Sequence, residues 1–149
     1  MNTNNKALRL LCLLSLCGFV YCMAIDATNC YVFAFLEEVK KNPAALDGLQ
    51  STIDDWETKG IVFNEDLVSQ LIKLYAFRVA FDVLALLGVA LVYFRIKLGL
   101  TIYIIFQLSY VVFPFALLGQ QSMVIFPIIS VFIHLLYIVL FLTQKKKLH

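Results

Sequence analysis

Four polar side chains stand inside long apolar runs of this 149-residue sequence, and their chemistry is the first question it raises. Arg78 and Asp82 are four positions apart, so on a helix they share one face and could form an ion pair. Gln107 and His134 lie in two later apolar runs. A charge in hydrocarbon costs about 2.5–3.5 kcal/mol on insertion scales, so residues of this kind indicate either a functional site or a structural pairing.

If each apolar run crosses a membrane as a helix, Asp82, Gln107 and His134 lie at similar depths. At 1.5 Å per residue they are about 12, 16 and 18 Å from the same membrane boundary. One interpretation is a small intramembrane site for a proton, an ion or a ligand. The other, which we favour, is structural: Arg78 pairs with Asp82, and Gln107 and His134 make interhelical hydrogen bonds. Asp26, at the end of the first apolar run, is a candidate second partner for Arg78, which otherwise could extend to the interface as an anchor.

The composition is typical of an integral membrane protein. Hydrophobic residues make up 62% of the chain and charged residues 15%, whereas a soluble domain is closer to half apolar and a quarter charged. The net charge of +2 is too small to indicate a nucleic-acid partner. The expected partners are the lipid bilayer and either further copies of the chain or a larger membrane complex.

The apolar runs predict an all-α fold, an antiparallel four-helix membrane bundle that forms a single domain over residues 1–149. The spans are expected at about 8–27, 74–94, 98–118 and 123–143, with a helical extramembrane segment at about 28–70. The first run could instead be a signal peptide cleaved after Ala24. Because apolar character resumes at Ala27–Leu36, a retained helix that continues past Asp26 is favoured.

Local signals predict the ends of the helices around the extramembrane segment. Asn42, followed by proline, is expected to cap one short helix, and the run 51–54 resembles a capping box for a second, joined to the first near Gly48. Gly60 is expected to end the second helix, and Asn64 to cap a long helix that continues into the second span.

Two prolines flank the turn between the third and fourth spans. Pro114 could kink the third span and widen that end of the bundle, or be absorbed without a kink. Pro127 is expected to begin the regular part of the fourth span.

The basic residues predict the orientation in the membrane. They cluster at Lys6 and Arg9, at Arg95 and Lys97, and at Lys145–Lys147, whereas the segment between the first two spans is acidic. Under the positive-inside rule both termini are then cytoplasmic and the acidic segment is outer or luminal. Lys146 and Lys147 also resemble a dilysine retrieval signal, so a bacterial inner membrane and a eukaryotic endoplasmic reticulum or plasma membrane stay open alternatives.

The sequence contains no recognised catalytic motif such as H-E-x-x-H or G-x-S-x-G, and its four cysteines form no C-x-x-C pair. We therefore expect no enzyme activity, no cofactor and no metal. The first hypothesis is a non-enzymatic accessory, assembly or interaction subunit. The alternative is a small transporter or channel component that uses Asp82, Gln107 and His134. A third, an enzyme that uses the outer acids Asp54, Asp55 and Glu57, competes with the simpler explanation that these acids form a solvated helix face.

Overall fold

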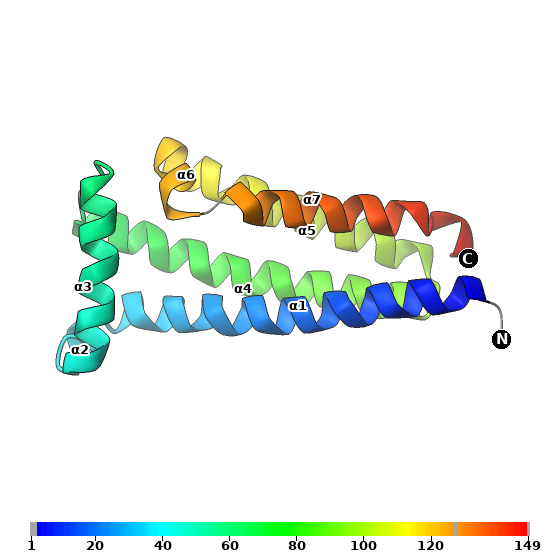
Figure 1. Cartoon of the computed structure of the whole chain (residues 1–149), viewed down its shortest axis with the longest axis horizontal. Helices are drawn as coiled ribbons and strands as arrows, with labels where there is room; N and C mark the ends of the chain where they lie inside the picture. Colours follow the sequence, from blue (N-terminus) through cyan, green and yellow to red (C-terminus); the bar gives the residue numbers. More distant parts are fainter. Residues whose placement is uncertain (1–2, 127, 149) are drawn as a thin grey trace.

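The computed structural model describes residues 3–126 and 128–148, and this part of the chain is helical with no strand (Figure 1). The helices are α1 (Thr3–Ala34), α2 (Leu36–Val39), α3 (Pro43–Thr58), α4 (Glu65–Tyr93), α5 (Lys97–Leu118), α6 (Ser122–Ile125) and α7 (Ile128–Thr143), with 3-10 turns η1 (Gly119–Gln121) and η2 (Lys145–Lys147). The prediction of an all-helical chain is confirmed.

Four helices, α1, α4, α5 and α7, run alongside one another along the length of the molecule (Figure 1). Both termini lie at one end, and α3 crosses the other end. α4 packs along both α1 and α5, whereas α7 packs mainly against α5 and only lightly against α1. Of these four helices, α7 is therefore the least tightly packed.

Three helical segments are long and apolar enough to cross a membrane, judged by length and composition: Lys6–Ala34, Glu65–Tyr93 and Lys97–Ile125. Each has 29 residues, which corresponds to about 44 Å for the first two at 1.5 Å per residue, against about 30 Å of hydrocarbon. The third includes η1 and α6, and its continuous helix α5 has 22 residues and is about 33 Å long. The remaining apolar helix, α7, has 16 residues and is about 24 Å long.

α1 continues past Asp26 to Ala34, as the resumed apolar character of the sequence indicated, and the Asp26 side chain is buried and bonded to α4. The helix therefore extends beyond the span predicted at about 8–27. The segment predicted as the fourth span, 123–143, contains α6 and then α7. Phe126 between them is extended (φ −114°, ψ 123°), the conformation favoured for a residue that precedes proline. Pro127 itself lies outside the described residues.

The extramembrane segment contains one long helix instead of the two predicted. α3 continues through Gly48, and Thr52 Oγ1 donates a hydrogen bond to the Gly48 carbonyl. The second helix that was predicted to begin at the run 51–54 therefore does not form. The predicted caps are confirmed: Asn42 and Asn64 accept hydrogen bonds from the backbone at the starts of α3 and α4. Gly60, with φ +82°, follows the end of α3.

Aromatic packing fixes α3 on the ends of α1 and α4. The Trp56 ring stacks on Phe33 with centroids 6.3 Å apart, and Phe33 stacks on Tyr75 at 5.9 Å. These rings belong to a buried apolar core at the α3 end. A second apolar core, which includes Tyr103 and Phe141, lies nearer the termini.

The α4–α5 hairpin turns within three residues. Arg95 adopts the left-handed conformation (φ 65°), and the Ile96 amide donates to the Leu91 carbonyl, which closes the end of α4. On either side of this turn, Gly88 and Gly99 allow the two helices to approach closely.

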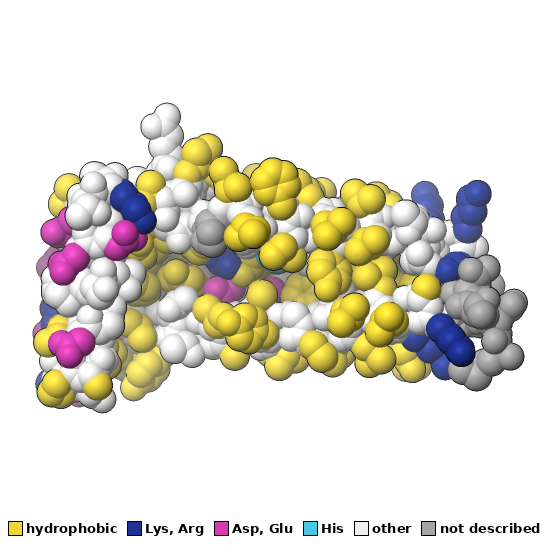
Figure 2. Space-filling view, in the orientation of Figure 1, with side chains coloured by type: hydrophobic (Ala, Val, Ile, Leu, Met, Phe, Trp, Pro, Cys, Tyr) yellow, Lys and Arg dark blue, Asp and Glu magenta, His cyan; other side chains and the backbone are white. Residues whose placement is uncertain are grey.

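On the face shown in Figure 2, charged side chains gather at the two ends of the molecule, and the surface between them is mostly apolar. Acidic residues mark the α3 end, where Lys40, Lys41 and Lys59 are each paired with an acid. The hydrogen bond from Lys40 lowers the pKa of the exposed Glu37 carboxyl. The opposite end carries basic side chains.

Candidate functional site

A group of buried polar side chains separates the two apolar cores. We call it the polar cluster, and it comprises Asp26 on α1, Arg78 and Asp82 on α4, Gln107 and Tyr110 on α5, and His134 on α7. It therefore draws on all four long helices. The sequence had singled out every member except Tyr110.

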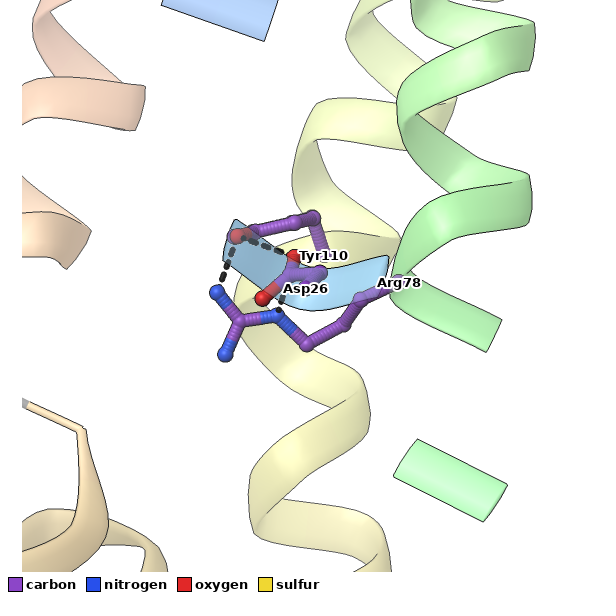
Figure 3. A network of polar contacts seen from close by, with 3 residues as sticks. All are labelled: Asp26, Arg78 and Tyr110. Atoms are coloured by element: carbon purple, nitrogen blue, oxygen red, sulfur yellow. Dashed lines mark hydrogen bonds and ion pairs between the residues drawn. The ribbon is translucent and has the colours of Figure 1, made fainter. Parts of the chain in front are cut away.

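An ion pair between α1 and α4 forms the centre of the polar cluster (Figure 3). Arg78 Nε donates to Asp26 Oδ2 at 3.1 Å, and the Tyr110 hydroxyl donates to the same oxygen at 2.9 Å. A further hydrogen bond joins the Arg78 guanidinium to the Tyr110 hydroxyl. Asp26 is 2% and Arg78 7% exposed, so the guanidinium is held inside the protein and does not act as an interfacial anchor.

Aromatic rings enclose the Arg78 guanidinium. Its Cζ atom lies 4.1 Å from the ring centroid of Tyr110 and 4.4 Å from that of Phe126. Cation–π contacts of this kind contribute about 2 kcal/mol or more when they are desolvated. The rings thus compensate part of the cost of removing the guanidinium from water.

Asp82 does not form the predicted ion pair with Arg78. The four-residue spacing places both side chains on one face of α4, but Asp26 of α1 faces the same position and takes the guanidinium. Asp82 is 0% exposed, and neither carboxylate oxygen has a hydrogen-bond partner in the part of the chain that the structure describes. Within the described residues, Asp82 is the one member of the polar cluster without a hydrogen bond, and an ionised carboxylate there is costly.

Gln107 and His134 join α5 to α7. The Gln107 side-chain oxygen and His134 Nδ1 are hydrogen-bonded, and because an amide oxygen only accepts, Nδ1 carries the proton. The His134 ring also packs on Tyr110, with centroids 4.5 Å apart. Tyr110 therefore connects the Gln107–His134 pair with the Asp26–Arg78 pair. A cavity of about 20 Å³ beside Arg78 and His134 has room for about one water molecule.

Replacing Gln107 by leucine should remove the hydrogen bond to His134 while keeping the volume of the side chain. Hydrogen bonds between membrane helices contribute about 0.6 kcal/mol on average and at most about 1.7 kcal/mol, so we expect a loss in that range. This loss of stability is measured as a lower thermal midpoint, read from the fluorescence of the single tryptophan, Trp56. Gln121→Leu, at an exposed position in the turn after α5, makes the same substitution elsewhere and is the matched control. An unchanged midpoint in Gln107→Leu would contradict the pairing.

The chemistry available to the polar cluster is proton or cation handling and helix pairing. Two carboxyl groups and one guanidinium are present, so one carboxyl group is left to be neutralised by a proton or a cation. No group of three His, Cys, Asp or Glu side chains suited to a metal ion occurs within residues 3–126 and 128–148.

Tyr110 is the member of the polar cluster that the sequence did not reveal. In an apolar run a tyrosine looks like one more aromatic residue. Its hydroxyl reaches Asp26 only because α1 and α5 both pack against α4. Comparison with protein-family models, with curated proteins and with solved structures finds no match for this chain.

Proposed function

We propose that this chain is a small polytopic membrane protein that serves as a non-enzymatic accessory or assembly subunit. In the arrangement proposed, α1, α4 and α5 cross the membrane fully, and the segment containing α6 and α7 completes a fourth span. The close packing of α1 along α4 supports a retained first span over a cleaved signal peptide.

The distribution of charge supports the proposed orientation. Both termini and the α4–α5 turn lie at one end, which carries basic side chains, and the acidic α3 lies at the other. With the basic end cytoplasmic, the arrangement obeys the positive-inside rule. The stacking of Trp56 and Phe33 supports α3 as an outer cap on the helices.

The observation that carries the proposal is that the bonded polar side chains connect different helices. Asp26, Arg78 and Tyr110 join α1, α4 and α5, and Gln107 and His134 join α5 and α7. Interhelical hydrogen bonds of this kind hold membrane helices together where lipid provides no hydrophobic driving force. A bundle fixed in this way is suited to presenting a stable surface to a partner.

Native extraction tests the accessory role. The full chain would be taken from its membrane in polymer-bounded nanodiscs and its mass and composition measured. We expect a defined homo-oligomer or a fixed-stoichiometry complex, weakened in His134→Ala. A single copy in each disc, with His134→Ala equal to the wild type in thermal stability, would overturn the proposal.

A second candidate function is proton or cation transfer, and Asp82 is the observation that favours it. Its carboxyl group is fully buried and without a hydrogen-bond partner in the described chain, as expected of a group that binds and releases a proton or a cation. Four membrane spans are few for a transporter, so this function would require several copies of the chain to assemble.

The Asp82→Asn variant separates the two candidates. Asparagine replaces a buried carboxyl group that has no hydrogen-bond partner in the described chain, so the free energy of unfolding should stay unchanged or rise by about 1–3 kcal/mol, whichever function is correct. In liposomes loaded with a pH-sensitive dye, the accessory role predicts equal and negligible proton flux in the wild type and the variant. Flux in the wild type that Asp82→Asn abolishes would establish the second candidate. Asp66→Asn, at the exposed start of α4, is the matched control.

A further inference from the structure

A cleft of about 290 Å³ opens between α1 and α7, with α5 behind it. Figure 2 shows a hollow between the two rows of apolar side chains, and the basic and acidic side chains visible in its depth lie toward the α3 end. No charged residue is among those that line the cleft in the described part of the chain. It exists because α7 packs only lightly against α1. Gly18 contributes to the opening, since it places no side chain in the space and nothing lies within 4 Å of the position its Cβ would take.

Two buried hydroxyl groups line the cleft, and neither has a hydrogen-bond partner among residues 3–126 and 128–148. Ser15 is 4% and Tyr103 0% exposed, and both are wall residues of the cleft. The hydroxyls are neighbours, but the geometry between them is not that of a hydrogen bond. A buried hydroxyl without a partner costs about 1–3 kcal/mol, so a polar ligand atom at this position would be stabilised.

The described wall of the cleft carries polar groups but no charged side chain. Gln107 and His134 add an amide donor and, at His134 Nε2, an acceptor, because Nδ1 already bonds to Gln107. A ligand suited to this wall is uncharged and offers both a hydrogen-bond donor and an acceptor. A hydroxyl group meets both requirements, whereas a phosphate headgroup would bring an unpaired charge.

Both sides of the mouth are apolar. Exposed Leu14, one helical turn before Gly18, lies beside it on α1, and exposed Ile129 and Ile133 line it on α7. In the membrane arrangement proposed above, the mouth opens to the acyl chains. A ligand that enters there carries a hydrocarbon tail and a small head.

We propose that this cleft binds a neutral lipid with a hydroxyl-bearing head, of the diacylglycerol type, through the hydroxyl groups of Ser15 and Tyr103. The tail lies along the apolar sides of α1 and α7, and the head reaches the polar wall formed with α5. This inference rests on the proposed membrane location but not on the accessory role.

Photolabelling in vesicles tests the site. The full chain is reconstituted into dioleoyl phosphatidylcholine vesicles containing a diacylglycerol with a diazirine in one acyl chain. We expect labelled peptides from α1 and α7 and competition by unlabelled dioleoylglycerol. Flotation of the chain with the vesicles checks the membrane location separately, so a chain that floats but is not labelled contradicts the site alone.

Variants test which residues hold the lipid. Gly18→Phe fills the cleft and should lower labelling about ten-fold, equivalent to about 1.4 kcal/mol of affinity. The matched control is Gly48→Phe on α3, where a Cβ atom also has nothing within 4 Å. This variant should be labelled as strongly as the wild type. Ser15→Ala and Tyr103→Phe each remove one hydroxyl and should lower labelling about five-fold.

Two outcomes would overturn the proposal. The first is equal labelling of the same peptides by a phosphatidylcholine with the same diazirine chain, which would indicate lipid surrounding the protein. The second is full labelling of Gly18→Phe, which would place the lipid outside the cleft.

Discussion

Arg78→Gln is expected to lower the free energy of unfolding by about 3–5 kcal/mol, because it leaves a buried carboxylate without its cation. Asp26 would keep only the hydrogen bond from Tyr110, and Asp82, already without a hydrogen-bond partner in the described chain, would lose the nearest guanidinium. The thermal midpoint of the purified chain, read from Trp56 fluorescence, is the measurement.

Two further variants sharpen this test. The double variant Asp26→Asn/Arg78→Gln removes both charges of the pair, so most of the lost stability should return. Lys97→Gln, at an exposed position, removes a cation elsewhere and should change stability by less than about 0.5 kcal/mol. Equal midpoints for Arg78→Gln and Lys97→Gln would show that the ion pair does not stabilise the bundle.

The ends of several helices were predictable because the signals that set them are local. Asn64 caps α4 with its own side chain, and Gly60 adopts the left-handed conformation that a glycine tolerates best. Where tertiary packing competes with such signals, it prevails. The run 51–54 resembles a capping box, but no helix begins there. Instead α3 is one continuous helix that packs against α1 and α4 through Trp56.

The polar cluster could be identified from the sequence but its bonds could not. Polarity alone marks Arg78, Asp82, Gln107 and His134 in apolar runs, and the depths predicted for Gln107 and His134 agree with the hydrogen bond between them. The four-residue spacing along α4 suggested that Arg78 forms an ion pair with Asp82. The partner of a buried guanidinium, however, depends on which helix packs over it. That helix is α1, which brings Asp26.

The helices of the α4–α5 hairpin approach each other closely, and this approach too depends on packing that the sequence does not display. A Cβ atom on Gly88 would lie 2.7 Å from the backbone nitrogen of Tyr103, and one on Gly99 would lie 2.7 Å from the Gly88 carbonyl oxygen. Both obstacles are backbone atoms, which cannot rotate away as a side chain can. The two glycines therefore set the distance between α4 and α5.

Gly88→Ala and Gly99→Ala are accordingly expected to destabilise the chain by about 1–3 kcal/mol each, the usual cost of overpacking, despite the better helix propensity of alanine. Gly48→Ala is the matched control: it lies in α3 with nothing within 4 Å, so alanine should stabilise it by up to about 1 kcal/mol. A lower thermal midpoint for Gly88→Ala together with a higher one for Gly48→Ala would support the close approach of α4 and α5. Stabilisation at both positions would show that α4 and α5 are farther apart, and the buried packing of Tyr103 would then need revision.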